Sequence, residues 1–327
     1  MSIDDRQSSN QSRWSMVGKD PYSIPLDEID LSHPGIWQAN EFLPFLERLR
    51  KEAPVHYCRQ SAVGPYWSVM KYADIMTVDT SPELYSSEPT VGIVDTFEEF
   101  TLPMFIAMDP PKHDVQRKIV QPVVAPDNLK QLESLIRQRV CTIFDELPVG
   151  EEFDWVKHVS IELTTQMLAT LFDFPFADRH KLTYWSDVAT AIPGGGVVNT
   201  QEERWAAIQE CLGYFTRLWN ERVNSDPGND LISMLAHGDA TRNMPPMEYL
   251  GNVILLIVGG NDTTRNSLTG GVLALNENPA EYDKLRNNVG LIPNMVSEII
   301  RWQTPLAYMR RTAKADTELG GQQIKAG

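Results

Sequence analysis

The sequence contains Leu255-Leu-Ile-Val-Gly-Gly-Asn-Asp-Thr-Thr264, a segment that interrupts a long apolar helical pattern with two glycines, a carboxylate and a hydroxyl. Each glycine costs a helix roughly 1 kcal/mol relative to alanine. Gly259, Asp262 and Thr263 share one helix face at i, i+3 and i+4, and Thr263 can bond back to the Gly259 carbonyl. The pattern predicts a flat ligand lying against the helix, with an acid and an alcohol beside its reactive atom. A glycine notch in an ordinary core helix is the alternative.

A second helix is predicted in the segment Asp109-Pro-Pro-Lys-His113-Asp-Val-Gln-Arg117. Asp109 is expected to be its N-cap, with Pro110 in the first turn. His113 and Arg117, at i and i+4, would direct two donors to one point near the start of the helix. Two such donors suit a carboxylate ligand.

A third helix is expected to carry the pair Glu298-x-x-Arg301 and to end before Pro305, because proline disfavours the helical conformation in the residue before it. Spacing places the two charged side chains on the same side of the helix. The pair is interpreted as a structural charge network that supports the core, and it is left outside the catalytic set.

Taken together, these segments and Arg311-Thr-Ala313 resemble the cytochrome P450 haem-thiolate monooxygenases, from about Glu41 to the last residue. The run Ile257–Asn266 is similar to the soluble bacterial alkane and fatty-acid terminal hydroxylases. The resemblance implies a mainly α fold with small β-sheets, of the α+β class. It implies a P450 domain over residues 41–327, incomplete at its C-terminus, whereas the polar residues and scattered prolines of 1–40 predict a polar N-terminal extension.

The resemblance assigns haem b as the cofactor and gives roles to the residues that would hold it. The haem would lie under two glycines with its propionates paired with basic side chains, at positions Gly259, Gly260, His113, Arg117 and Arg311. Thr263 would hydrogen-bond dioxygen, and Asp262 would connect it to a proton supply, so that one oxygen atom leaves as water. These two residues form the expected catalytic pair.

The family binds its iron through a cysteine in a loop that follows the Glu-x-x-Arg helix, and none of the three cysteines here has that context. Cys58, Cys141 and Cys211 are interpreted as buried structural residues. We therefore expect the chain to be the N-terminal part of a longer protein, without the thiolate ligand and inactive alone. The alternative is that the isolated chain is a non-catalytic helical remnant.

The substrate is expected to be hydrophobic, because apolar residues are frequent in two loop regions, and the resemblance to alkane and fatty-acid hydroxylases implies that it is linear. One is the loop from Ser86 to Pro103, and the other is the break Pro193-Gly-Gly-Gly196 between two helices of a lid. Exposed loops seldom carry so many apolar side chains without covering them, although ordinary loop packing is the alternative. The expected lining residues are Val91, Ile93, Ile192, Leu256, Leu306 and Ala307.

The resemblance also implies that electrons come from NAD(P)H through a ferredoxin reductase and an acidic ferredoxin. Lys112, Arg117 and Lys118 cluster on the helix that would receive the ferredoxin, although a solvated helix face gives the same pattern for the two lysines.

Composition excludes several other classes. A formal net charge of −15 argues against a general nucleic-acid binder. The apolar runs are shorter than the roughly 18 residues that a spanning helix needs. A polar N-terminus and three unpatterned cysteines favour a cytoplasmic protein. A chain of 327 residues, 42% hydrophobic and without an interior linker, favours one large domain.

Hydrophobic periodicity predicts the remaining elements. Hairpins are expected at Val55–Arg59 with Tyr66–Met70 and over the last ten residues, and helices over Phe42–Glu52, 129–144, 155–172, 177–192 and 201–224.

Overall fold

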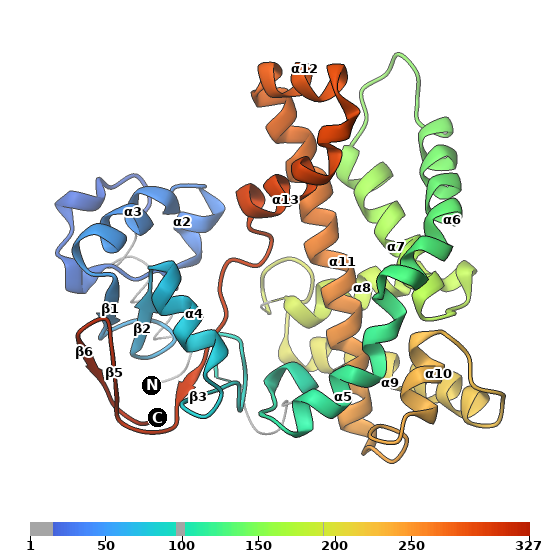
Figure 1. The fold of residues 1–327 in the computed structure, drawn as a ribbon, viewed down its shortest axis with the longest axis horizontal. Helices are drawn as coiled ribbons and strands as arrows, with labels where there is room; N and C mark the ends of the chain where they lie inside the picture. Colours follow the sequence, from blue (N-terminus) through green and yellow to red (C-terminus); the bar gives the residue numbers. More distant parts are fainter. Residues whose placement is uncertain (1–15, 96–101, 192) are drawn as a thin grey trace. The chain divides into compact units, whose positions relative to one another are not determined.

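The computed structural model describes residues 16–95, 102–191 and 193–327. Over these residues the chain is mostly helical, with three two-stranded antiparallel sheets (Figure 1). The expected α+β class is therefore confirmed. The chain divides into two compact units where one large domain was expected. Unit 1 comprises the described residues of Met1–Glu98 with Ala107–Pro110 and Met309–Gly327, and unit 2 comprises those of Glu99–Ile106 and Pro111–Tyr308.

Unit 1 contains all the strands of the described structure. Antiparallel pairing joins β1 to β2, β3 to β4 and β5 to β6. The predicted helix and both predicted hairpins are confirmed. The elements are 3-10 turns Pro21–Ser23 and Leu26–Glu28, α2 (Pro34–Gln38), α3 (Phe42–Glu52), β1 (Val55–Cys58), β2 (Tyr66–Val69), α4 (Tyr72–Thr80), β3 (Tyr85–Ser86), β4 (Thr312–Ala313), β5 (Thr317–Leu319) and β6 (Gln322–Ile324).

Residues 16–40 belong to the core of unit 1, which differs from the expected polar extension. Their apolar side chains pack on Phe45 and Leu49 of α3, and those of Ile29 and Ile36 are completely buried. Arg48 of α3 also donates from Nη1 to the Ile24 carbonyl at 2.5 Å. The apolar residues are spaced among prolines and polar residues, so they show no helical or strand period. Residues 1–15 of the expected extension lie outside the described residues.

Unit 2 is helical, and α11 is its central element (Figure 1). The long helix packs against α7, α8, α9 and α13. The elements are α5 (Lys112–Val120), a 3-10 turn Gln121–Val124, α6 (Pro126–Asp145), a π-helical stretch Val156–Ile161, α7 (Glu162–Leu171), a 3-10 turn Phe176–Asp178, α8 (His180–Thr190), α9 (Gln201–Val223), α10 (Leu231–His237), α11 (Pro246–Glu277), α12 (Pro279–Asn287), a 3-10 turn Val289–Leu291 and α13 (Ile292–Gln303). These bounds confirm the predicted helices.

The end of α13 also follows the prediction. The helix stops at Gln303, and Thr304 takes a left-handed conformation with φ 46° before Pro305. Glu298 and Arg301 form a bidentate pair with two bonds of 2.7 Å, which confirms their predicted pairing. Their side chains are 59% and 65% exposed, so the pair does not support a core within the described structure.

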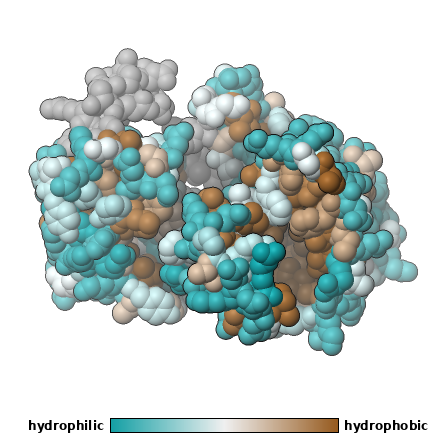
Figure 2. All heavy atoms as spheres, turned by 90° about the horizontal axis from the view of Figure 1, so that it is seen from above, coloured by the Kyte–Doolittle hydropathy of each residue, from teal (hydrophilic) through white to brown (hydrophobic). Residues whose placement is uncertain are grey.

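Apolar side chains are also exposed on the surface. Figure 2 shows several apolar patches on one face of an otherwise mainly hydrophilic surface. On α13 the exposed apolar side chains follow a helical stripe, Ile292, Val296 and Ile300. The same helix therefore has an apolar stripe beside its charged pair.

Candidate functional site

The two glycines in the middle of α11 have different surroundings. A Cβ added to Gly260 would stand 2.7 Å from Cδ2 of Leu168, so this glycine allows α7 to approach α11 closely. A Cβ added to Gly259 would meet no atom within 4 Å, and Gly259 is exposed. Only Gly259 leaves open space on the helix surface. The predicted position of a flat ligand is therefore open at Gly259, whereas Gly260 is packed against Leu168.

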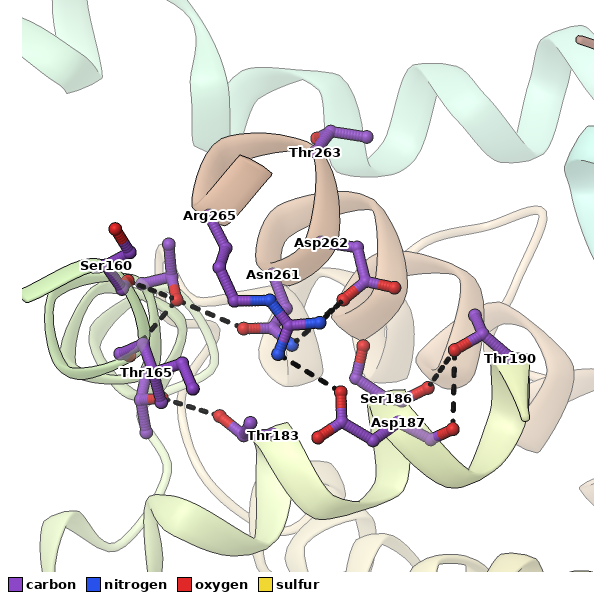
Figure 3. A network of polar contacts seen from close by, with 12 residues as sticks. Ser160, Thr165, Thr183, Ser186, Asp187, Thr190, Asn261, Asp262, Thr263 and Arg265 are labelled. Carbon is purple, nitrogen blue, oxygen red and sulfur yellow. Dashed lines mark hydrogen bonds and ion pairs between the residues drawn. The ribbon is translucent and has the colours of Figure 1, made fainter. Parts of the chain in front are cut away.

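Thr263 stands one turn after Gly259 and is bonded to it. Its Oγ1 donates to the Gly259 carbonyl at 2.8 Å, as the sequence predicted. In Figure 3 the Thr263 side chain points away from the polar network that contains Asp262. The acid and the alcohol are therefore neighbours in sequence with different surroundings, which differs from the expected common position beside one reactive atom.

Asp262 is held by an arginine of its own helix. Nη2 of Arg265 donates to Oδ1 of Asp262 at 2.6 Å, and Nη1 donates to Oδ1 of Asp187 on α8 at 3.1 Å. Burial raises the pKa of the Asp262 carboxyl, with Arg265 lowering it and Asp187 raising it. The guanidinium accounts for the orientation of Asp262 away from Thr263 (Figure 3).

The neighbouring Asn261 anchors the same turn of α11. It is completely buried, and its Oδ1 accepts a hydrogen bond of 3.1 Å from Oγ1 of Thr164 on α7. The same Oγ1 of Thr164 lies 3.0 Å from the Ser160 carbonyl, so its single proton is shared between the two acceptors. This turn of α11 therefore carries an amide fixed inside unit 2 next to a carboxylate that is only half-buried.

A polar chain fastens α5 to α11. Nε2 of Gln116 donates to Glu248 at 2.5 Å, and Nδ2 of Asn252 donates to Gln116 at 3.0 Å. The backbone N–H of Phe105 donates to Oδ1 of Asn252 at 2.8 Å. Lys112 adds an ion pair of 2.8 Å to Glu248. Three buried side chains therefore set the position of α5 and of the backbone at Phe105.

His113 is oriented by the backbone at Phe105, which this polar chain holds in place. Its Nδ1 lies 2.8 Å from the Phe105 carbonyl, which can only accept, so Nδ1 carries the proton. Nε2 has no partner among the described residues, and only the doubly protonated ring could donate from it to an anion. Arg117 is exposed, and its side chain has no hydrogen bond or ion pair to any described residue. These two donors are therefore available to a carboxylate ligand.

The prediction that Asp109 caps this helix is wrong. The N-cap position of α5 is Pro111, and no side chain bonds to the first turn. Asp109 instead accepts hydrogen bonds from Oγ of Ser86 at 2.7 Å and from the N–H of Ser87 at 2.9 Å. Lys314 adds a contact of 3.3 Å. The Asp109 carboxylate therefore bonds to residues from distant parts of unit 1 and not to the free N–H groups at the start of α5.

Arg311 of unit 1 has a carboxylate partner. It donates to Asp79 of α4 at 2.7 Å and to the Arg310 carbonyl at 2.9 Å. A propionate would share this guanidinium with Asp79, whose side chain is 60% exposed. The predicted role of Arg311 thus requires a change of partner.

Arg310 is a residue that the sequence analysis missed. Its N–H donates to the Val91 carbonyl at 2.8 Å, and its Nη1 donates to the Ile93 carbonyl at 3.3 Å and to Asp95 at 2.6 Å. These bonds hold the backbone of two predicted substrate residues, Val91 and Ile93. The adjacent pair Arg310-Arg311 was the available signal.

The other predicted substrate residues are partly placed. Leu256 is half-buried on α11, and Leu306 and Ala307 are exposed after α13. Ile192 lies outside the described residues. No role is tested for these positions, so they stay predictions.

The three cysteines differ from one another. Cys58 and Cys211 are buried as predicted, and burial raises the pKa of the Cys58 thiol to about 11 and that of Cys211 well above its usual value. Cys141 is exposed on α6, so the prediction that it is buried is wrong. A raised pKa disfavours the thiolate that would bind iron. Neither buried cysteine therefore fits an iron ligand.

Comparison with known proteins identifies the family, although no family model matches the chain. It is 30% identical to linalool 8-monooxygenase of Pseudomonas putida over 92% of this chain and 77% of the relative. It is 32% identical to the putative cytochrome P450 YjiB of Bacillus subtilis, over 87% and 71%. The chain belongs to the cytochrome P450 family. It is thus a P450 monooxygenase, an enzyme of a haem-containing family.

Solved P450 structures support the same assignment. The structure of CYP153D17 from Sphingomonas sp. PAMC 26605 matches with 47% identity and a TM-score of 0.85, over 93% of this chain and 77% of that one. Cytochrome P450-153 from Novosphingobium aromaticivorans matches with 45% identity and a TM-score of 0.84, over 91% and 75%. The resemblance predicted from the motifs is therefore confirmed.

The residues of this P450 fit a haem at the distal helix and at the propionates. Gly259 offers open space on α11, and Arg117 is an uncompensated cation. The described residues contain no group of His, Cys, Asp and Glu side chains that could hold a metal ion by itself. No helix in that same part of the chain has the length and apolar character needed to cross a membrane.

Proposed function

We propose that this P450 hydroxylates unactivated C–H bonds of linear hydrophobic substrates, such as alkanes or fatty acids, at a terminal carbon. The reaction would use O2 and electrons from NAD(P)H. The observation that carries the proposal is the open surface at Gly259 next to the Thr263 hydroxyl. The similarity to the methyl-branched lipid omega-hydroxylase of Mycobacterium tuberculosis, 28% identical over 95% of the chain, supports the substrate class.

Bound haem would supply the activation of dioxygen, and the chain's own residues would place it and deliver protons. Gly259 admits the flat face of the ligand. His113 and Arg117 would pair with its propionate groups, because Nε2 of His113 and the side chain of Arg117 have no partner among the described residues and would neutralise charge that is costly to desolvate. Arg311 of unit 1 would bind a propionate only after it gives up Asp79.

Thr263 and Asp262 are proposed to supply protons to dioxygen. The Thr263 hydroxyl donates to the Gly259 carbonyl, so its proton becomes available to another acceptor only after rotation about the Cβ–Oγ1 bond. Burial raises the pKa of Asp262, and this favours a carboxyl that holds a proton to higher pH than an exposed aspartate does. Asp262 is held by Arg265 and points away from Thr263, so it would have to leave Arg265 before it could pass a proton toward Thr263 (Figure 3). That proton would let one oxygen atom leave as water.

Electrons are proposed to arrive through a ferredoxin and its NAD(P)H-dependent reductase. On α5, Lys112 is already paired with Glu248, whereas Lys118 is exposed and has no ion pair to a described residue. Lys118 is therefore the lysine of this helix whose charge is free to attract an acidic partner.

The proposal is tested by product analysis of the haem-containing protein with ferredoxin, reductase and NADPH. A linear alkane and the matching fatty acid are expected to give terminal alcohols in an O2-dependent reaction. A fused-ring steroid of similar hydrophobicity should give little product. Oxidation of the steroid in preference to both linear substrates would contradict the substrate class.

The open surface at Gly259 is tested by the substitution Gly259→Leu. In the folded chain a leucine meets no neighbour at Cβ and favours the helix by roughly 0.5–1 kcal/mol relative to glycine. Thermal stability of the haem-free protein should therefore stay equal or rise, while the haem-to-protein ratio falls several-fold. Gly213→Leu on α9, also open at Cβ, is the matched control and should keep full haem content. Equal haem content in both variants would remove Gly259 from the cofactor site.

A further inference from the structure

Two carboxylates share one guanidinium where α8 meets α11. Asp187 lies on α8, and Asp262 and Arg265 lie on α11 (Figure 3). The Arg265 bond to Asp262 is 2.6 Å and its bond to Asp187 is 3.1 Å. The side chains of Asp262, Arg265 and Asp187 are 22%, 18% and 34% exposed, so solvent screens the group only in part. The cluster carries one positive charge for two acids.

No other described group supplies a positive charge to Asp262 in place of Arg265. Arg265 and Asp187 are the charged groups that act on Asp262. The amide of Asn261 is 3.5 Å from Asp262, beyond good hydrogen-bond length, and is fixed by Thr164. The hydroxyl of Ser186 is buried on α8 without a partner in the described structure, so it does not neutralise either acid. The charge state of Asp262 therefore depends on how the Arg265 guanidinium distributes its hydrogen bonds between Asp262 and Asp187.

The distribution of these hydrogen bonds depends on the position of α8, which carries Asp187. With α8 in place, Asp187 takes one side of the guanidinium and adds a like charge near Asp262, which favours the protonated acid. If α8 moves away, Arg265 bonds Asp262 alone, which favours the ionised acid. Helix α8 ends at Thr190. The loop after it contains Gly194 and Gly196 at φ 84° and 98°, backbone conformations that residues other than glycine rarely adopt.

We infer that Asp187 is a positioning residue for Asp262: by competing for Arg265, it couples the place of α8 to the ability of Asp262 to supply a proton. The inference rests on the proposed function for the role of Asp262 in proton supply. The competition itself rests on the contacts of Asp187, Arg265 and Asp262.

The substitution Asp187→Asn tests the competition. It keeps the shape of the side chain, removes the repulsion and frees Arg265 for Asp262, so the pKa of Asp262 should fall. Arg265→Gln should raise the same pKa, because it removes the lowering cation. The readout is the carbonyl stretch of the protonated Asp262 carboxyl, followed by infrared difference spectroscopy against pH in the haem-containing protein, with Asp262→Asn to identify the band.

The control is Asp173→Asn, which makes the same change of net charge at an exposed residue paired with Arg222. It should leave the Asp262 band where it is. An unchanged or raised midpoint in Asp187→Asn would overturn the inference. In turnover, the pH at which product yield per NADPH declines should move down in Asp187→Asn, in step with the band.

The two proposals fail in different ways. If the infrared midpoint moves as expected while product yield stays independent of pH and of Asp262→Asn, the proton role of Asp262 fails and the competition stands. If Thr263 and Asp262 variants lose product yield while Asp187→Asn leaves the midpoint unmoved, only the inference about Asp187 fails.

Discussion

Replacing Thr263 by alanine is expected to separate electron uptake from product formation. The variant loses the hydroxyl that donates to the Gly259 carbonyl, and the exposed surface of α11 loses its nearest proton-bearing group. NADPH consumption should continue, because haem and substrate contacts are unchanged. Product per NADPH should fall about tenfold, which corresponds to roughly 1.4 kcal/mol, the net value of one hydrogen bond. The missing electrons should appear as hydrogen peroxide.

Neighbouring substitutions make this result specific. Thr263→Ser keeps a hydroxyl and should recover most of the product yield. Thr264→Ala changes an exposed neighbour that makes no hydrogen bond through its side chain in the described structure, and it should behave like the unaltered protein. Alcohol product, peroxide and NADPH are measured in the same reaction. Full coupling in Thr263→Ala with a linear alkane would reduce the Thr263 hydroxyl to a helix-bending role.

Local signals in the sequence were sufficient for most of the elements. The helix Phe42–Glu52 has the predicted bounds, and the hairpin of β1 and β2 pairs Val55 with Val69. The segment 16–40 could not be predicted in the same way. Its buried residues enter the core singly, Ile29 at the end of a 3-10 turn and Ile36 on the five-residue helix α2, so burial there depends on tertiary packing that has no period in the sequence.

The same difference between local and distant partners explains which contacts of the candidate site were predicted and which were missed. The bond from Thr263 to Gly259 lies within one helical turn and was predicted. The bond from Arg265 to Asp187 joins residues 78 positions apart, and no spacing rule indicates it. Arg310 was missed for the same reason, since its partner Ile93 is 217 positions away. Sequence motifs predicted the candidate site residues, whereas the distribution of charge around Asp262 became visible only from the packing of α8 on α11.

The packing of α11 also predicts the largest change in stability. A Cβ added to Gly251 would overlap the carbonyl oxygen of Pro103 and stand 2.7 Å from its carbonyl carbon. Both atoms belong to backbone, which cannot rotate aside as a side chain does. The next residue of α11, Asn252, accepts a hydrogen bond from the N–H of Phe105, so this segment is also held against the helix.

Gly251→Ala is therefore expected to lower the free energy of unfolding by about 3 kcal/mol, against the roughly 1 kcal/mol that alanine adds to an open helix position. Gly213→Ala on α9 has no neighbour within 4 Å of its Cβ and should gain stability, which makes it the matched control. The measurement is the denaturant midpoint and slope for each variant. Displacement of Phe105 would also remove the acceptor that orients His113, so the haem-to-protein ratio of Gly251→Ala should fall beyond the loss of folded protein. Stabilisation of both variants alike would mean that residues 102–105 do not cross α11 at Gly251.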